Sequence, residues 1–249
     1  MDKEILKYYS RKDIQKAILN ESENKEVAVS YSDKGFGKRP DILQFENDIY
    51  ELAKLGATSF HISEEHWKNP LLLKPGMTKK ELDELRSGWD CIFDLDSNYF
   101  EYARIAALLI IEALKFHDIK NIGIKFSGNK GIHLGISFKS FPYKVNNILT
   151  KDLFPEGVRV IALYLKEMIK EQLSIKLLEK DSIEDLAKNT LQEKSNLTKN
   201  GIFDPFTIVD IDTLLISNRH VYRAPYSLHE KSGLVSLPLK FQDLLSFKF

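Results

Sequence analysis

Two aspartates stand two positions apart within an apolar run, in the segment Cys91-Ile-Phe-Asp-Leu-Asp-Ser97. Side chains alternate between the faces of a β-strand, so Asp94 and Asp96 are expected to project from the same face. Neighbouring carboxylates repel each other unless a positive charge lies between them. Hard oxygen ligands favour Mg²⁺ or Mn²⁺. The pair therefore predicts a divalent-metal site, and a helix cap beside a solvated carboxylate is the structural alternative.

A glycine-bearing turn, Ser127-Gly-Asn-Lys-Gly-Ile-His133, follows about thirty residues later. Gly128 and Gly131 allow a backbone to approach a ligand closely, so that its amides can meet phosphate oxygens. Lys130 adds a positive charge, and His133 begins a strand with a small, polar face. The turn predicts a phosphate site, whereas a tight hairpin with a hydrogen-bonded histidine is the alternative.

A third group begins at Val209-Asp-Ile-Asp212, again two alternating carboxylates. A stretch rich in cationic and aromatic side chains comes directly after it, and such side chains suit a phosphate and base site. These are Arg219, His220, Tyr222, Arg223, Tyr226, His229 and Lys231. A charged surface loop is the alternative, but it does not account for carboxylate strands alternating with cationic loops.

Together the three groups fit phosphoryl transfer assisted by two metal ions. Carboxylates would hold the cations, and cationic side chains with turn amides would bind a triphosphate. From the residues alone, a polymerase, a nuclease and a nucleotidyl cyclase all remain open.

Composition narrows the classes of protein. Lys plus Arg equals Asp plus Glu, so the net charge is zero and any nucleic-acid binding must come from a local groove. The single cysteine, Cys91, excludes an internal disulfide, a cysteine-rich zinc site and an iron–sulfur cluster held by this chain alone. The glycines of the loop at 32–40 lack the Walker A spacing. No secretory signal is visible, and the longest apolar run, Ile105–Ile111, is too short to span a bilayer. We therefore expect an intracellular, soluble protein.

The elements that must position these residues follow from periodicity. Helices are expected over the first twenty residues and over 47–55, 78–85, 99–116 and 158–173, with Thr78 as an N-cap. Strands are expected at 57–62, 91–97, 121–126, 132–138 and 206–212, and the last thirty residues are expected to form short strands and turns. No Gly/Pro/Ser-rich linker divides the chain. We predict one catalytic unit over residues 1–249, with mixed helices and strands.

The three motifs, in this order, resemble the small, catalytic subunit of archaeal and eukaryotic DNA primase, in the primase-polymerase superfamily. Phe93-Asp94-Leu95-Asp96 matches its first motif and Ser127–His133 its second. The third is an Arg/Lys-x-Pro-x-Ser-x-His-x-Lys-x-Gly pattern, matched by Arg223, Pro225, Ser227, His229, Lys231 and Gly233. The segments at 8–14 and 35–40 look like the archaeal branch.

The resemblance implies a two-lobed α+β catalytic fold with an RRM-like module. It implies a DNA-directed nucleotidyltransferase that makes short primers on a single-stranded DNA template from nucleoside triphosphates, using Mg²⁺ or Mn²⁺. Metal ligands and catalytic residues would be Asp94, Asp96 and Asp212, with Asp210 as the alternative to Asp212. Nucleotide-binding residues would be Ser127, Gly128, Asn129, Lys130, His133, Arg223 and His229. An iron–sulfur-containing large subunit is the expected partner, in a primosome at the nucleoid in the cytoplasm.

The sequence departs from the family pattern at three points, one of which is the third motif, where two aspartates, Asp210 and Asp212, stand at a spacing that does not match perfectly. Asn129 and Lys130 stand where relatives often have two arginines, so phosphate binding must rely on Lys130 and backbone amides. One cysteine cannot build the zinc knuckle found in many relatives. End-joining or gap-filling synthesis and a non-catalytic nucleic-acid-binding subunit are the alternative functions, and the preferred sugar stays open. Lys34, Lys38 and Arg39 are candidates for a template groove, or else form a solvated loop.

Overall fold

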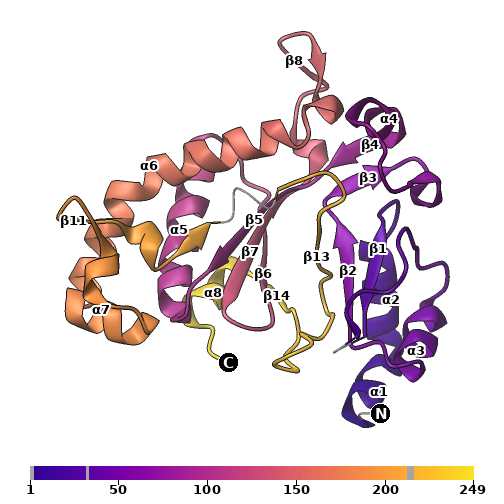
Figure 1. The fold of residues 1–249 in the computed structure, drawn as a ribbon, viewed down its shortest axis with the longest axis horizontal. Helices are drawn as coiled ribbons and strands as arrows, with labels where there is room; N and C mark the ends of the chain where they lie inside the picture. Colours follow the sequence, from indigo (N-terminus) through magenta and orange to yellow (C-terminus); the bar gives the residue numbers. More distant parts are fainter. Residues whose placement is uncertain (1–2, 32–33, 212–215) are drawn as a thin grey trace.

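The computed structural model describes residues 3–31, 34–211 and 216–249. They form the mixed α+β fold that the sequence predicts, in two lobes that lie side by side (Figure 1). No helix among these residues has the length and apolar character needed to cross a bilayer.

A five-stranded antiparallel sheet forms the centre of the larger lobe, with the strand order β12-β5-β7-β6-β14. The strands are β5 (Cys91–Asp96), β6 (Gly123–Phe126), β7 (Gly131–Ile136), β12 (Asp210–Ile211) and β14 (Pro238–Leu239). Along the chain, the module runs β5-α5-β6-β7-α6-β12, where α5 is Phe100–Phe116 and α6 is Glu156–Lys180. This βαββαβ order is the RRM-like module that was expected.

Helices α5 and α6 pack against one face of this sheet and against each other (Figure 1). Phe93 and Leu95 of β5 point into this core and are fully buried. Ile132 and Leu134 of β7 do the same. Because side chains alternate along each strand, the residues between them emerge on the opposite face. The apolar half of each strand thus fixes the direction in which the polar half points.

The N-terminal lobe has its own sheet, with the order β1-β2-β13. Its strands are β1 (Val27–Ser30), β2 (Ser59–Ser63) and β13 (Val221–Arg223), and its helices are α1 (Lys3–Tyr9), α2 (Lys12–Glu21) and α3 (Glu46–Lys54). Strand β13 comes from the end of the chain and pairs with β2. The segment that carries Arg223 therefore joins the N-terminal lobe to the larger one (Figure 1).

The single helix expected over the first twenty residues is wrong, because the chain forms α1 and α2 with a break at Ser10 and Arg11. Arg11 is extended, with φ −70° and ψ 124°. The Nε2 amide of Gln15 donates to the carbonyl of Tyr9 at 2.7 Å, which satisfies an acceptor left free at the end of α1.

A hairpin of β3 (Glu65–Trp67) and β4 (Arg86–Trp89) lies between the lobes, with α4 (Lys79–Leu85) in its connection. The predicted cap is confirmed. The Thr78 hydroxyl accepts from the amide of Glu81, whose carboxylate accepts from the amide of Thr78.

The remaining elements are peripheral: the hairpin β8 (Lys144–Val145) and β9 (Ile148–Leu149), helix α7 (Ile183–Thr190), and the hairpin β10 (Thr198–Lys199) and β11 (Ile202–Phe203). The extended run expected at 206–212 is wrong where it is described. A short 3-10 helix covers Pro205–Thr207, and the strand is only Asp210–Ile211. Helix α8 (Phe241–Ser246) was also missed; Asp243 caps its first turn.

Candidate active site

Asp94 and Asp96 leave the same face of β5, as their spacing predicts. In the ladder, Asp94 lies directly opposite His133 of β7, and Asp96 lies directly opposite Gly131. Both aspartates are partly exposed, whereas Leu95 between them is fully buried on the other face. The alternation thus brings two carboxylates and an imidazole together over the middle of the sheet.

Gly131 makes room for Asp96. A Cβ atom at position 131 would lie 1.9 Å from Oδ1 of Asp96 and 2.8 Å from the carbonyl oxygen of Leu95. No side chain fits into that space. The sequence argument gave this glycine a role in approach to a ligand, but the group that approaches it is a carboxylate of the protein itself.

Asp94 is held ionised beside His133. Its Oδ1 lies 3.2 Å from Nε2 of His133, and no other described residue is a hydrogen-bond partner of this buried oxygen. Burial opposes ionisation of Asp94, but His133 and Lys125 outweigh it, so its pKa lies below the ordinary value. A buried, ionised carboxylate oxygen is a fitting ligand for a cation.

The turn after β6 is closed by Ser127. Its backbone amide donates to the carbonyl of Gly131 at 2.9 Å, and its Oγ accepts from the amide of Gly131 at 3.1 Å. Gly128 has φ +95°, and a Cβ there would lie 3.0 Å from Cβ of His229. The turn and the His229 loop therefore pack directly against each other.

A cavity of about 210 Å³ lies over these residues and collects side chains that are far apart in the sequence. It is lined by His61, Asp94, Asp96, Ser127, Asn129, Lys130, His133, His220, Val221, Tyr222, Arg223 and His229. Of the expected site residues, Gly128 does not line the cavity, and Asp212 lies outside the described residues. The others converge on it.

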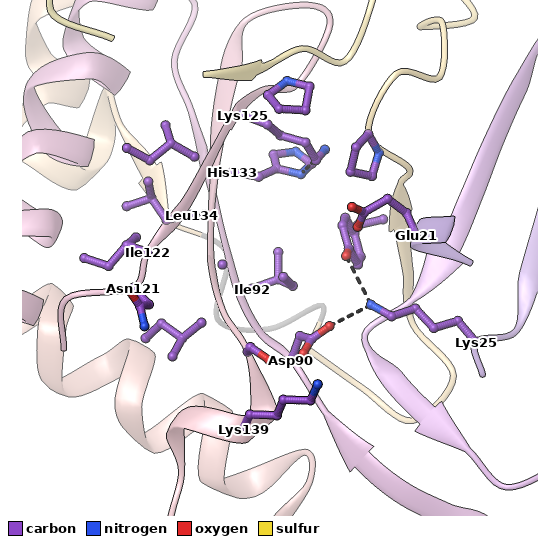
Figure 2. Close-up of a pocket in the computed structure, with 18 of the residues that line it drawn as sticks. Glu21, Lys25, Asp90, Ile92, Asn121, Ile122, Lys125, His133, Leu134 and Lys139 are labelled. Carbon is purple, nitrogen blue, oxygen red and sulfur yellow. Dashed lines mark hydrogen bonds and ion pairs between the residues drawn. The ribbon is translucent and has the colours of Figure 1, made fainter. Parts of the chain in front are cut away.

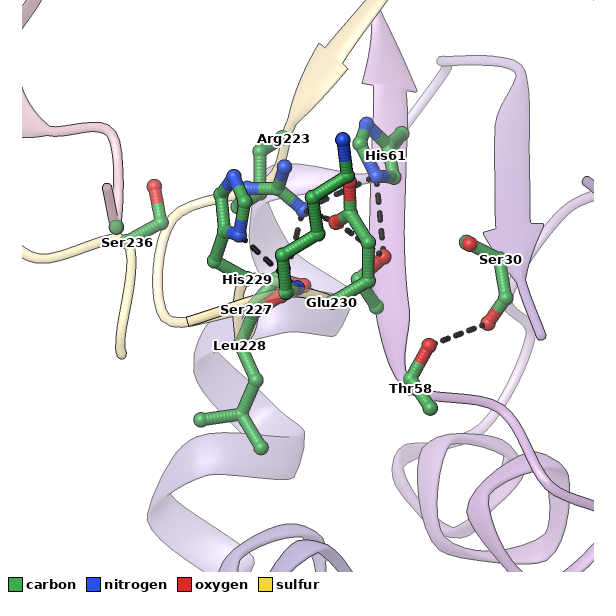
Figure 3. Close-up of polar contacts among 12 residues, drawn as sticks. Ser30, Thr58, His61, Arg223, Ser227, Leu228, His229, Glu230 and Ser236 are labelled. Carbon is green, nitrogen blue, oxygen red and sulfur yellow. Dashed lines mark hydrogen bonds and ion pairs between the residues drawn. The ribbon is translucent and has the colours of Figure 1, made fainter. Parts of the chain in front are cut away.

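The guanidinium of Arg223 is held in place by several hydrogen bonds. Its Nη1 donates to Glu230 at 2.6 Å and lies 3.2 Å from Nε2 of His61, and its Nε donates to the carbonyl of Ser127 at 3.2 Å. Figure 3 shows Arg223 between the loop of His229 and Glu230 and the strand of His61. Its Nη2 donates to no residue in the described part of the chain, so one edge of the guanidinium can meet an anion.

Two imidazoles of the cavity, those of His61 and His229, are shifted toward the neutral form. Burial, followed by the charge of Arg223, lowers the pKa of His61 to about 3 and also lowers the pKa of His229. The amides of Lys231 and Ser232 donate to Nδ1 of His229 at 3.2 and 3.3 Å. The ring proton of His229 must therefore sit on Nε2.

Acidic side chains of the N-terminal lobe hold the segment before β13. Glu26 is fully buried and accepts from both Arg39 and Arg219, and Glu65 accepts from the amide of Arg219. His220, which faces the cavity, lies 2.9 Å from Glu64 through Nδ1. Arg39 is thus a structural residue rather than a free groove residue, whereas Lys34 and Lys38 are exposed.

Several lining residues escaped the sequence motifs. His61 lies in β2 without a surrounding pattern, and Lys125 lies beneath the cavity, opposite His133 in the β6–β7 ladder. Pairing the two strands across the Ser127–Gly131 turn would have revealed Lys125, since a short turn fixes the register of a hairpin. Nothing in the sequence marks His61.

A second cavity of about 890 Å³ continues along the same face of the sheet and shares His133 and Tyr222 with the first. Figure 2 shows its far end, where Lys25 donates to Asp90 at 2.7 Å. The two cavities therefore form one continuous groove rather than an isolated pocket.

The chain is similar in sequence and fold to known proteins. A family model for the DNA primase small subunit matches residues 93–241, more than half of the chain. The chain is 28% identical over 200 residues to the DNA primase small subunit PriS of Pyrobaculum calidifontis and 29% over 191 residues to that of Pyrobaculum islandicum. Each match covers 66% of this chain and 57% of the relative. The chain therefore spans little more than half the length of these curated relatives.

The fold is similar to that of the polymerase domain of Mycobacterium tuberculosis Ligase D, solved in complex with DNA. The TM-score is 0.56 over 96% of this chain and 81% of that one, at 16% sequence identity. This likeness supports the two-lobed fold described above.

Proposed function

The chain belongs to the DNA primase small-subunit family, and on that premise we propose that it is a DNA-directed nucleotidyltransferase that makes short primers on single-stranded DNA. The observation that carries the proposal is one cavity in which Asp94 and Asp96 face the Ser127–His133 turn and Arg223. Paired carboxylates beside a cationic phosphate site are the parts that nucleotidyl transfer requires.

Divalent metal ions, Mg²⁺ or Mn²⁺, fit the part of the site formed by Asp94 and Asp96. Asp94 and Asp96 offer hard carboxylate oxygens, and the buried Oδ1 of Asp94 has only His133 as a polar neighbour among the described residues. Within residues 3–31, 34–211 and 216–249, no three histidine, cysteine or acidic side chains form a complete metal shell. We propose Asp212 as the third ligand. When bound, the metals would activate a 3′-hydroxyl and neutralise the leaving pyrophosphate.

The third carboxylate can be identified by two variants. Asp210 is described, and it pairs with Asp96 in the ladder. We expect Asp212→Ala to eliminate nucleotide incorporation and Asp210→Ala to retain it. The reverse result would assign the role to Asp210.

The incoming triphosphate would lie against the part of the site formed by the Ser127–His133 turn, Arg223 and His229. The hydroxyl of Ser127, the ammonium of Lys130, Nη2 of Arg223 and Nε2–H of His229 are its donors, with the amides of Gly128 and Asn129 completing the turn. His133 lines the same cavity, with its Nε2 3.2 Å from Oδ1 of Asp94. Glu230 neutralises part of the Arg223 charge and fixes the position of the guanidinium. Donors held in this way need little rearrangement when charge develops on the phosphates.

The template and partner belong to the same proposal. A neutral chain offers little general attraction for DNA, so template binding by this chain alone should be weak and strongly dependent on salt. We propose that a large primase subunit with an iron–sulfur domain strengthens initiation. The complex would act inside the cell, at the nucleoid.

Primer-free synthesis tests this function most sharply. Single-stranded DNA, nucleoside triphosphates and Mg²⁺ or Mn²⁺ are incubated with the chain, with and without a large subunit, and a parallel reaction contains a primed template. We expect short products without a primer. Extension of primed or gapped templates alone would instead indicate end-joining or gap-filling synthesis, and binding without synthesis in either reaction would indicate a non-catalytic subunit.

A further inference from the structure

Lys125 is a buried lysine that none of the motifs assigns. Only 6% of its surface is exposed, although it lies on the same sheet face as the two aspartates. Its Nζ lies 2.9 Å from Nδ1 of His133 and 2.9 Å from Oγ of Ser236, over the ring of Tyr222. Figure 2 shows the side chains of Lys125 and His133 lying against each other. Such burial is costly unless each donor finds a partner.

The direction of these hydrogen bonds follows from counting protons. The hydroxyl of Ser236 donates its proton to the carbonyl of Phe126 at 3.2 Å, so it must accept from Lys125. An ammonium has no lone pair, so the contact to Nδ1 of His133 is also a donation. Nδ1 is then an acceptor, and the proton of a neutral imidazole sits on Nε2.

The three residues form one row across the sheet. Asp94 of β5 lies opposite His133 of β7, which lies opposite Lys125 of β6. Nε2 of His133 is 3.2 Å from Oδ1 of Asp94. We propose that Lys125 is a positioning residue, which holds His133 with its proton on Nε2 and directs that proton at Asp94 and at a phosphate bound beside it.

The role of the His133 proton in phosphate binding rests on the proposed function. The test of the tautomer does not. Burial, with a contribution from Arg223, lowers the pKa of Lys125 to about 7, against the opposing charge of Asp94. Even the neutral amine keeps two protons, one for Ser236 and one for His133. The arrangement therefore persists in both protonation states of the lysine.

The imidazole nitrogens can be observed directly. Protein labelled with ¹⁵N in histidine reports the tautomer of each ring by NMR, and the His133 signals are those lost in His133→Gln. We expect the Nε2–H form for His133 in the unmodified protein and a mixture of tautomers in Lys125→Met. Lys25→Met is the matched control, because Lys25 is also buried and lies over the Tyr222 ring, but it contacts Asp90 instead of His133.

An Nδ1–H tautomer in the unmodified protein would overturn the proposal, whatever the variants do. So would an unchanged His133 tautomer in folded Lys125→Met. Neither measurement needs activity, so a failure here is distinct from a failure of the proposed function.

Enzyme kinetics provide a second, independent test of the coupling between Lys125 and His133. Loss of a charge-assisted hydrogen bond typically costs about 1.5–3 kcal/mol, or roughly tenfold or more. We expect Lys125→Met to lower kcat/KM by about tenfold in the unmodified background and by less than about twofold in His133→Gln, since the two residues act as a unit. Equal losses in both backgrounds would contradict the proposal.

Discussion

Replacing Gly131 by alanine tests the packing of the metal site without removing any functional group. The new Cβ would lie 1.9 Å from Oδ1 of Asp96, whereas Cβ atoms essentially never come within 3.0 Å of another heavy atom. The carboxylate must therefore move by roughly 1 Å, and displacement on this scale can cost about 10²-fold in rate. We expect Gly131→Ala to lose most of its nucleotide incorporation with every presumed ligand still present.

The same change should be visible in stability. The new Cβ would also lie 2.8 Å from the carbonyl oxygen of Leu95, which belongs to the backbone and cannot rotate away. Overpacking of this kind costs about 1–3 kcal/mol. For a chain of this size, each kcal/mol shifts Tm by about 2–4 °C. We therefore expect Tm to fall by roughly 2–12 °C in a calorimetric or fluorescence melt.

Gly123→Ala is the matched control. Gly123 lies on the same sheet, but the nearest heavy atom to its Cβ would be the carbonyl oxygen of Gly135 at 3.6 Å, an ordinary contact. This variant should stay within about 0.5 kcal/mol of the unmodified protein and retain its activity. If Gly131→Ala were as stable and as active as Gly123→Ala, the close approach of Asp96 to Gly131 would be wrong.

Two further predictions concern the charges that hold the site. Glu26→Ala leaves the guanidiniums of Arg39 and Arg219 without their buried partner and should cost about 3–5 kcal/mol in a urea unfolding experiment; a loss below about 1 kcal/mol would contradict this role. Burial opposes ionisation of Glu230, but Arg223 lowers its pKa to about 2, so its stabilising effect is complete above the unfolded pKa near 4.5 and is lost as pH falls toward 2. The stability difference between the unmodified protein and Glu230→Gln should therefore shrink from pH 6 to pH 3, and a constant difference would exclude this coupling.

The parts of the fold with strict periodicity were predictable from the sequence. Side chains of strand β5 alternate with period two, so Cys91, Phe93 and Leu95 face a core. Ile92, Asp94 and Asp96 face the groove. Thr78 and Glu81 form a local capping box that depends on four residues only. Local signals of this kind need no knowledge of the tertiary fold.

The errors lie where local patterns are ambiguous. Ile5 and Tyr9 are four residues apart, as are Ile14 and Ile18, so each pair fits a helix by itself. The step from Tyr9 to Ile14 is five residues, which would put the two pairs on opposite sides of one continuous helix, and the single-helix prediction ignored this shift. The β-branched run after 206 was likewise too short to separate a strand from a 3-10 turn. The intrinsic helix and strand propensities of the residues do not mark either feature.

The remaining site residues depend on pairing between strands. Lys125 meets His133 through the β6–β7 register, and His61 meets Arg223 because β13 returns to pair with β2 of the N-terminal lobe. Contacts between residues 162 positions apart leave no local signal. The motifs identified most of the groups that line the cavity, whereas the groups that hold them in place could be identified only from the fold.

The central claim is that Asp94 and Asp96 support metal-dependent nucleotidyl transfer, and Asp96→Ala tests it most directly. Template-directed incorporation of a labelled nucleotide is measured over a range of Mg²⁺ and Mn²⁺ concentrations. Asp13→Ala, on an exposed aspartate of α2, is the control. We predict that Asp96→Ala is folded and incorporates no nucleotide at any metal concentration, while Asp13→Ala matches the unmodified protein. Incorporation at the unmodified rate by Asp96→Ala would contradict the account.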